Sequence, residues 1–337
     1  MKEAVVSKGP KVQIIDSPVP EPGADQVVIK VVVSGSNPKD WKLPFWTDST
    51  RNEGDDIAGI VHAVGENVYE FKPGDRVAAF HEVLTPGGSY AEYAVAWQHT
   101  TFHIPKQTTF EEAAAIPLAA MTSAVGLYLR LGLPQPWAPA TEPTPLVIYG
   151  AASAVGAYAI QLAQQSNIHP LICVAGQSGA HVEGLIDRGK GDMVLDYRAG
   201  DDAVVQGLEK AADGKPLLYA FDAVSEKGSY ENLAKVLAHG AKLALVLPGK
   251  DYGATLPDYI SYSFTNVNSV HKEHKDFGFV YFRYLARGLL EGWFRPQPQV
   301  VVPGGLAGVQ QALENLMAGK ANAVKYVFRI ADTEGVE

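Results

Sequence analysis

A run of seven small residues carries the clearest chemical signal in this chain. The run is Gly150-Ala151-Ala152-Ser153-Ala154-Val155-Gly156, and it lies between an apolar strand-like stretch, residues 146–149, and an apolar helical stretch, residues 157–163. Small residues at a strand-to-helix turn let the backbone approach a pyrophosphate, whose charge meets the exposed N–H groups of the helix start. The run therefore predicts a dinucleotide site. The glycine pattern is imperfect, because Ser153 stands where such turns usually have glycine. The alternative is that the small residues only allow tight packing of the helix on the sheet.

The next predicted strand, residues 171–174, indicates which dinucleotide binds. A site that selects NAD usually places Asp or Glu about 20 residues after the turn, where the carboxylate binds the ribose hydroxyls. Here the strand is followed by Ala175-Gly176-Gln177-Ser178-Gly179, which contains no carboxylate. Ser178 could accept a 2′-phosphate, helped by His181, Tyr197 or a basic residue of the tail. NADPH is therefore favoured, and the alternative is that Ser178 and Gly179 only form a turn and cap the next helix.

Composition excludes several other kinds of site. Cys173 is the only cysteine among 337 residues, which excludes a disulfide framework and a zinc ion held by two thiolates. A formal net charge of −9 without a basic cluster argues against a nucleic-acid surface. We find no signal-peptide pattern and no window close to the roughly 20 apolar residues of a membrane span. We therefore expect a cytoplasmic protein with no nucleic-acid or membrane partner.

The elements that must position these residues change in character along the chain. Short alternating stretches separated by Pro- and Gly-containing turns predict a partly closed β-sheet, with strands at 4–6, 12–15, 26–34, 56–64, 76–80 and 91–95. Helical stretches follow at 111–115 and 117–131. A proline-rich surface connector, residues 134–145, comes next.

From residue 146 onward, apolar strands alternate with helices. This alternation is typical of a doubly wound parallel sheet. We expect strands at 146–149, 171–174, 193–195, 218–222 and 242–246, and helices ending near 166 and 188 and covering about 202–212 and 230–237. The tail, with helices at 277–291 and 306–318 and strands at 299–302 and 324–330, is expected to rejoin the first domain. Residues 42–51 and 251–270 are expected to be loops that shape the substrate pocket.

Several motifs, in order over essentially the whole chain, resemble the quinone-oxidoreductase branch of the medium-chain dehydrogenase/reductase superfamily. They are Asn37-Pro38-Lys39-Asp40-Trp41-Lys42, Glu53-Gly54-Asp55-Asp56-Ile57-Ala58-Gly59, Phe71-Lys72-Pro73-Gly74-Asp75-Arg76-Val77, Gly87-Gly88-Ser89-Tyr90-Ala91-Glu92-Tyr93, Ala115-Ile116-Pro117-Leu118-Ala119-Ala120-Met121-Thr122 and Phe221-Asp222-Ala223-Val224. Within that branch the chain is most similar to fungal proteins that include stand-alone enoyl reductases partnering polyketide synthases. The resemblance implies a Rossmann NADPH-binding domain, residues 120–269, inserted into a GroES-like β-barrel catalytic domain, residues 1–119 and 270–337. Family members occur as monomers and as homodimers.

The resemblance also bears on metal chemistry. Zinc-dependent relatives have a Cys in the region of Asn37, a His in the region of residues 54–56 and a later Cys, whereas this sequence has Asn37 and acidic residues there. We expect no metal. Without that Lewis acid, oxidation of an unactivated alcohol is disfavoured. Hydride transfer from a nicotinamide to a conjugated double bond is easier, since charge spreads onto a carbonyl oxygen that hydrogen-bond donors stabilise.

Three residues are candidates for the reaction centre by resemblance. Asn37 is expected near the nicotinamide and the substrate, although Asn37-Pro38 could also only shape a turn. Thr122 resembles the family threonine that contacts the nicotinamide ribose or amide, and an ordinary helix hydroxyl is the alternative. Lys325 matches a tail position that reaches the cofactor, and a solvated strand lysine is the alternative.

Other candidates follow predicted strand ends, where ligands bind to parallel sheets. Residues expected in the cofactor wall are Ala223, Val224, Leu247 and Pro248. No general acid is assigned, because solvent can supply the proton and the conceivable donors are better explained as structural or surface residues: His81, Tyr90, Tyr262 and His271.

The expected function is therefore NADPH-dependent reduction of the carbon–carbon double bond of an α,β-unsaturated carbonyl. The substrate would be a small enone or an enoyl thioester, including a polyketide-like chain bound to a carrier. Two alternatives remain open. One is an NADPH:quinone oxidoreductase, and the other is a non-catalytic NADPH-binding sensor or structural protein.

Overall fold

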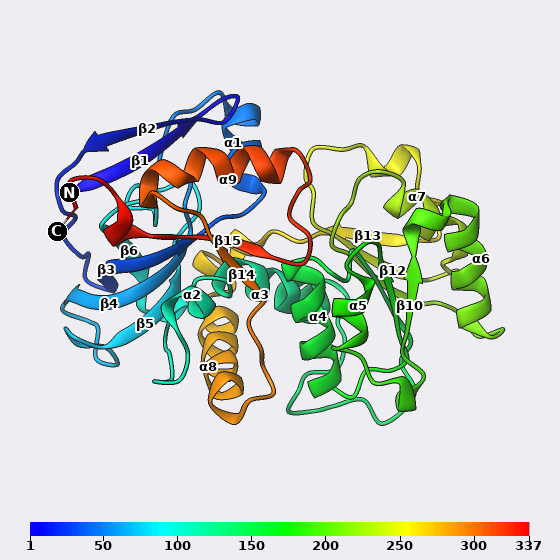
Figure 1. The fold of residues 1–337 in the computed structure, drawn as a ribbon. Coiled ribbons are helices and arrows are strands. Elements are labelled where there is room, and N and C mark those ends of the chain that lie inside the picture. Colours follow the sequence, from blue (N-terminus) through cyan, green and yellow to red (C-terminus); the bar gives the residue numbers. More distant parts are fainter. Residues whose placement is uncertain (337) are drawn as a thin grey trace. The chain divides into compact units, whose positions relative to one another are not determined.

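The computed structural model describes residues 1–336, which form two compact units (Figure 1). One unit combines residues 1–118 with the segment from Asn268 onward, and the other consists of Ala119–Val267. The second unit is thus inserted into the sequence of the first. The domain boundaries expected from the sequence, 119/120 and 269/270, lie close to these divisions, and the domain roles attached to them stay a prediction.

The first unit is built on mostly antiparallel strands that meet around one long central strand, with β14 and β15 paired in parallel. In the seven-stranded sheet β3 pairs with β15, β4 and β6, and the path runs β14-β15-β3-β4-β5-β7. A separate two-stranded sheet joins β1 and β2. The strands of this unit are β1 (Lys2–Ser7), β2 (Lys11–Asp16), β3 (Gln26–Gly35), β4 (Asp56–Val64), β5 (Arg76–Phe80), β6 (Tyr93–Trp97), β7 (Thr101–His103), β14 (Gln299–Val301) and β15 (Lys325–Arg329). The predicted strands are present, and the three-residue β7 was missed because it is too short to show a period.

Apolar residues at every second position of β3 give this sheet a buried face. Val27, Ile29 and Val31 lie two residues apart, so their side chains share one face, where they join a buried cluster with Val309 and Leu313. Val309 and Leu313 are four residues apart on α9 and therefore lie on one side of that helix. Each such fully buried aliphatic side chain contributes about 1.5–3 kcal/mol relative to exposure. The helices of this unit are α1 (Lys39–Thr47), α2 (Phe110–Ala113), α8 (Lys275–Glu291) and α9 (Gly308–Met317).

The helical segment Phe110–Arg130 corrects one expectation about membranes. By length and composition it could cross a membrane, contrary to the sequence analysis, but 89% of its most apolar window is buried inside the protein, as in a core helix. It consists of α2, α3 (Pro117–Ala124) and a π-helical turn, Val125–Arg130. A capping box between Thr109 and Glu112 begins α2.

The second unit confirms the predicted doubly wound parallel sheet. Its six strands are all parallel and follow the order β10-β9-β8-β11-β12-β13. The chain begins in the middle at β8, moves outward to β10, and returns to the other side of β8 at β11. The strands are β8 (Leu146–Tyr149), β9 (Leu171–Ala175), β10 (Met193–Asp196), β11 (Tyr219–Asp222), β12 (Lys242–Leu245) and β13 (Ser261–Phe264).

Helices cover both faces of this sheet, with α4 and α5 on one side and α6 and α7 on the other (Figure 1). Their bounds are α4 (Ala154–Gln165), α5 (Gly179–Glu183), α6 (Asp201–Ala212) and α7 (Ser229–Val236). The helix expected to reach residue 188 ends at Glu183, with a separate 3₁₀ turn at Arg188–Lys190.

Two stretches expected to be loops are partly regular. Helix α1 continues to Thr47, so residues 42–47 are helical despite the internal Pro44. The stretch 251–270 contains β13, which pairs with β12 in the register Leu243↔Tyr262. The period-2 signal of β13 was hidden because all four of its residues are at least partly exposed at the sheet edge.

Candidate functional site

The second unit's parallel sheet brings most of the predicted cofactor residues to one edge. Parallel strands all end at the same edge, and ligands of open sheets bind there, at the point where the strand order reverses. That point lies between β8 and β11. The predicted residues in the loops that follow these strands are Gly150 after β8, Ser178 after β9, Tyr197 after β10, Ala223 and Val224 after β11, and Leu247 and Pro248 after β12.

The turn between β8 and α4 is shaped by two glycines and one serine. Gly150 has φ of 77°, and a Cβ there would lie 2.4 Å from Val224 Cγ2. A Cβ on Gly156 would lie 2.4 Å from the carbonyl oxygen of Gly150. Ser153 caps α4, because its Oγ accepts the N–H of Gly156 at 3.0 Å. The serine that departs from the usual glycine pattern thus has a structural role of its own.

This turn fits a pyrophosphate. The first N–H groups of a helix have no partner inside the helix, and here they belong to Ala154 and Val155. Ser153 takes up the amide of Gly156, and the glycines keep side chains out of the turn. A negative charge placed at this helix start is favoured by the helix dipole as well as by the amides.

Thr122 is linked to this turn through its neighbour on α3. Ser123 Oγ donates to the carbonyl oxygen of Val155 at 2.6 Å, so α3 contacts the first turn of α4. Thr122 itself is buried. The structure therefore brings the helix that carries Thr122 beside the glycine turn, in the same unit.

The loop after β9 contains the turn of the alternative interpretation of Ser178, since the N–H of Gly179 donates to the carbonyl oxygen of Gly176 at 2.9 Å. Ser178 occupies the position before α5, but its side chain makes no capping hydrogen bond there. Ser178 is half-buried, while Tyr197 is 49% exposed. A Cβ on Gly176 would lie 2.5 Å from the Tyr197 ring, so the two loops touch. The Ser178 side chain therefore does not cap α5, and its contact with a 2′-phosphate stays a prediction.

Asp222 is a buried residue of this edge that the sequence analysis quoted without giving it a role. Its carboxylate accepts the N–H groups of Val224 at 2.9 Å and Ser225 at 2.8 Å, and the hydroxyl of Ser229 at 2.6 Å. Burial raises the pKa of Asp222 to about 6. These bonds hold Val224 against Gly150. A buried acid at the end of a predicted strand, followed by small residues, was the available signal.

The loops after β11 and β12 are joined through Ser225. Its Oγ accepts the N–H of Val246 at 2.9 Å, and its carbonyl oxygen accepts Lys250 Nζ at 3.0 Å. Tyr252 donates its hydroxyl to the carbonyl oxygen of Leu247 at 2.6 Å. Leu247 and Pro248 therefore belong to a braced loop.

In the first unit, Asn37, Asp56 and Lys325 form a buried polar triad. Lys325 Nζ contacts Asn37 Oδ1 at 2.7 Å and Asp56 Oδ2 at 2.6 Å, and Asn37 Nδ2 donates to the same carboxylate oxygen at 2.8 Å. Lys325 is only 5% exposed, so the alternative of a solvated strand lysine is wrong. Its expected contact with a cofactor stays a prediction. Asp56 was not among the predicted site residues.

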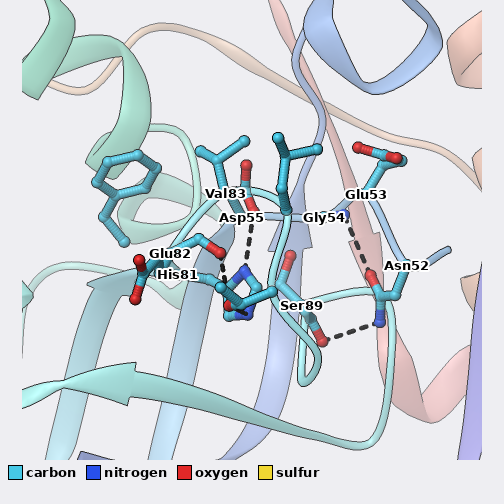
Figure 2. Close-up of polar contacts among 12 residues, drawn as sticks. Asn52, Glu53, Gly54, Asp55, His81, Glu82, Val83 and Ser89 are labelled. Atoms are coloured by element: carbon cyan, nitrogen blue, oxygen red, sulfur yellow. Dashed lines mark hydrogen bonds and ion pairs between the residues drawn. The ribbon is translucent and has the colours of Figure 1, made fainter. Parts of the chain in front are cut away.

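A second buried charge network lies next to the triad in sequence. Lys39 Nζ contacts Asp40 at 2.9 Å and Asp55 at 2.6 Å. Asp55 also contacts His81 Nδ1 at 2.9 Å, and Tyr90 donates its hydroxyl to Asp40 at 2.5 Å. Figure 2 shows the Asp55 carboxylate facing the His81 ring. His81 and Tyr90, weighed as proton donors, are thus held in structural contacts.

Charge and burial act in opposite directions within this network. Burial raises the pKa of Asp40 to about 6 and that of Glu53 to about 7. Burial also opposes ionisation of Asp55, but Lys39 and His81 bring its pKa below the ordinary value. For Lys39, burial lowers the pKa, and the surrounding carboxylates of Asp40, Asp55 and Glu53 outweigh it and raise the pKa. Among the described residues, no group of three or more His, Cys, Asp or Glu side chains is arranged to hold a metal ion.

The buried His271 and the half-buried His99 give a testable dependence of stability on pH. Burial, followed by the nearby His99 and His81, lowers the pKa of His271 to about 3, and burial lowers that of His99 to about 4. Both rings are therefore neutral in the folded protein at pH values where the unfolded chain, with an ordinary pKa of about 6.5, takes up protons. Their stabilisation is complete above about pH 6.5 and is lost as the pH falls below it.

We expect His271→Phe, which keeps a ring on Phe80, to reduce this acid sensitivity. Between about pH 6 and pH 4 the wild type should lose up to about 1.4 kcal/mol of unfolding free energy per pH unit more than the variant. Urea unfolding at several pH values measures the difference. The raised pKa values of Asp40 and Glu53 act with the opposite sign but are common to both proteins. Parallel stability curves for the two proteins would contradict the prediction.

Comparison with known proteins identifies a family and two relatives of this chain. Residues 23–106 match the alcohol dehydrogenase GroES-like domain family. The chain is 54% identical over 313 residues to the trans-enoyl reductase fsr4 of Gibberella fujikuroi, covering 91% of this chain and 92% of the relative. It is 31% identical over 372 residues to the trans-enoyl reductase resD of Aspergillus sclerotiorum, covering 97% of this chain and 100% of the relative.

Solved structures show the fold. The crystal structure of the CurK enoyl reductase superposes with a TM-score of 0.76 at 20% identity, covering 97% of this chain and 98% of that one. An alcohol dehydrogenase superfamily protein of Novosphingobium aromaticivorans gives a TM-score of 0.80 at 19% identity, covering 98% and 99%. The expected combination of a GroES-like domain and a Rossmann-type parallel sheet is confirmed. A solved NAD-dependent alcohol dehydrogenase also has this fold, with a TM-score of 0.75 at 23% identity, covering 98% of this chain and 99% of that one.

Proposed function

Because the chain belongs to the medium-chain dehydrogenase/reductase superfamily, and within it to the family of the trans-enoyl reductase fsr4, we propose that it reduces a carbon–carbon double bond conjugated to a carbonyl. The cofactor is NADPH, and the substrate is a small enone or an enoyl thioester. The observation that carries the proposal is the glycine turn, capped by Ser153, at the reversal point of the parallel sheet.

The second unit's residues hold and orient the cofactor in this proposal. The amides of Ala154 and Val155 bind the pyrophosphate, and Ser178 with Tyr197 receives the 2′-phosphate. Val224, Leu247 and Pro248 wall the nicotinamide half, and Thr122 orients its ribose or amide. A bound nicotinamide supplies a hydride to the carbon β to the substrate carbonyl.

Asn37 is the hydrogen-bond donor that we propose for the substrate carbonyl. Asn37 carries two hydrogens on Nδ2, and Asp56 accepts one of them. The other can be donated to the carbonyl oxygen, on which negative charge develops during the reduction. A fixed donor in a buried site stabilises such charge more strongly than water does, because it needs no reorganisation.

An acceptor panel tests the proposal. Purified protein with NADPH or NADH is offered an enone, an enoyl thioester of a pantetheine-type thiol, and a quinone, while cofactor absorbance is followed and products are identified by mass spectrometry. We expect NADPH consumption with the enone or thioester and a product with one double bond fewer. Quinone turnover alone, with a semiquinone radical signal, would instead indicate a quinone reductase. Tight NADPH binding without any turnover would indicate a non-catalytic protein.

Selectivity for NADPH gives a sharper prediction at Ser178. We expect Ser178→Asp to raise the KM for NADPH at least about tenfold, because a carboxylate repels the 2′-phosphate; this corresponds to about 1.4 kcal/mol. The KM for NADH should stay the same or fall, since a carboxylate can bind ribose hydroxyls. Ser178→Asn is the control, because asparagine has the size of aspartate without its charge. It should change the ratio of the KM values for NADPH and NADH little. Equal effects of Asn and Asp, or equal effects on both cofactors, would count against a phosphate at this position.

The remaining expectations are part of the same proposal. The protein is cytoplasmic, acts on a small molecule that is free or carrier-bound, and works as a monomer or a homodimer. Cell fractionation and sedimentation analysis test location and assembly separately from turnover.

A further inference from the structure

One carboxylate in the first unit joins three segments that are far apart in sequence. Asp56 is the first residue of β4 and is fully buried, opposite Gly35 in the β3–β4 ladder. Its Oδ1 accepts the N–H of Leu118, at the start of α3, at 2.6 Å. Its Oδ2 accepts from Asn37 Nδ2 and from Lys325 Nζ. Asp56 therefore connects the loop after β3, the start of α3 and the strand β15.

The chemistry of these partners decides which way the Asn37 amide faces. An ammonium group only donates hydrogen bonds, and a carboxylate only accepts them. The amide oxygen of Asn37 must therefore face Lys325, and its NH₂ group must face Asp56, as the distances of 2.7 and 2.8 Å show. A reversed amide would place NH₂ against the ammonium and oxygen against the carboxylate, and would leave both groups of the Asn37 amide without these partners, although Lys325 and Asp56 would still contact each other.

The backbone of Asn37 is fixed as firmly as its side chain. Its N–H donates to Asp40 Oδ2 at 2.6 Å. The preceding residue, Ser36, donates both its N–H and its hydroxyl to the carbonyl oxygen of Tyr326, each at 3.0 Å. Tyr326 follows Lys325 in β15, so the loop and the lysine move together. The second amide hydrogen of Asn37 consequently points in one direction.

Stability alone is a weak reason for such a triad. A buried ion pair loses much of its attraction to the cost of removing both charges from water, and apolar residues of similar volume often stabilise a fold equally well. The pair of Asp56 and Lys325 also sets the direction of the Asn37 amide as a hydrogen-bond donor, and an apolar pair could not do this. Polarisation by the neighbouring ammonium further strengthens the amide as a donor.

We propose that Asp56 and Lys325 are positioning residues of the reductase site: they fix the orientation of the Asn37 amide, whose second hydrogen binds the substrate carbonyl. This inference rests on the proposed function. It predicts that removing the Asp56 carboxylate lowers kcat while the protein stays folded and still binds its cofactor.

The test compares three variants with the wild type. Asp56→Asn leaves Lys325 without its anion, and we expect kcat to fall about 10- to 100-fold through misorientation of Asn37. The KM for NADPH should change by less than about threefold, because the triad is not part of the pyrophosphate turn. The double variant Asp56→Leu with Lys325→Met removes both charges; its melting temperature should recover towards the wild-type value while kcat stays low.

Asp192 offers a matched control. It is also buried, and its carboxylate contacts His169 Nδ1 at 2.8 Å and accepts the N–H groups of Leu171 at 2.7 Å and Asp187 at 3.0 Å. Leu171 begins β9, so Asp192 lies at the amino edge of the sheet, opposite the loops proposed to bind the cofactor. Asp192→Asn should lower the melting temperature as Asp56→Asn does, but leave kcat within about twofold of the wild type.

Two results would overturn the proposal. The first is a double variant that regains both thermal stability and kcat, since the pair would then be only structural. The second does not depend on activity: side-chain amide signals of Asn37, followed by NMR, should be dispersed and protected from exchange in the wild type and averaged in the double variant. Unchanged signals would overturn the positioning role. Absent wild-type turnover would count against the proposed function alone, and the NMR result would still decide the positioning of Asn37.

Discussion

Gly156→Ala should weaken binding of NADPH about 100-fold, which corresponds to about 2.7 kcal/mol. Intrinsic propensity predicts the opposite for stability, because alanine is favoured over glycine within a helix by about 1 kcal/mol. A steric clash in the folded protein outweighs this propensity, so we expect the substitution to be destabilising. The added methyl group would lie 2.4 Å from the carbonyl oxygen of Gly150 and 2.7 Å from Cα of Ala151. Both are backbone atoms, so the start of α4 must move away from the turn that is proposed to hold the pyrophosphate.

Isothermal titration with NADPH measures this loss, and thermal unfolding reports any accompanying loss of stability, expected at about 1–3 kcal/mol for an overpacked site. Gly207→Ala is the control, because a Cβ there would meet only the flexible Leu195 side chain, at 3.1 and 3.2 Å. That variant should bind NADPH normally. Unimpaired binding by Gly156→Ala would mean that the cofactor phosphates do not rest on this helix start.

Asn37→Ala should lower kcat about 100- to 1000-fold, the range observed when one donor to a developing negative charge is removed. The substitution deletes the proposed donor and leaves the Lys325 ammonium without its amide partner. The affinity for NADPH should change far less than kcat, because no pyrophosphate contact is lost. Steady-state kinetics with the acceptor found in the panel, together with NADPH titration, separates the two effects.

Asn52→Ala is the control for loss of a buried asparagine in the same unit. Asn52 donates to the carbonyl oxygen of Gly88 at 2.9 Å and accepts the N–H groups of Gly54 and Tyr90, each at 3.1 Å; Figure 2 shows it beside Gly54. Its replacement should cost stability without a comparable fall in kcat. If both variants lost activity in proportion to stability, Asn37 would be a structural residue and not a donor to the substrate.

Periodicity predicted the architecture because both sheets depend on local patterns. The strands of the parallel sheet are short apolar runs separated by helices, and β3 is a longer apolar run interrupted only by the exposed Lys30. Sequence periodicity failed to predict the elements that depend on tertiary contacts. β13 is an exposed edge strand that exists because β12 offers it a partner. Helix α1 continues through Pro44 although proline usually ends helices.

The candidate site was predictable only in part, for a similar reason. The glycine turn is continuous in sequence, and its chemistry can be inferred without the fold. The triad is not continuous. Asn37 reaches Asp56 across 19 positions and Lys325 across 288. Nothing local distinguishes Lys325 from a lysine on an exposed strand, and only the antiparallel pairing of β15 with β3 places it next to Asn37.

The hydrogen bonds that brace the loops after β11 and β12 affect how selectively the protein binds a ligand. Asp222 and Ser225 tie these loops into one piece, with hydrogen bonds of 2.8 to 3.0 Å that involve only residues of this chain. A flexible loop would lose conformational entropy each time a ligand bound, and this loss would lower the affinity. A wall that is rigid beforehand leaves more of the contact free energy for discriminating between ligands of similar shape.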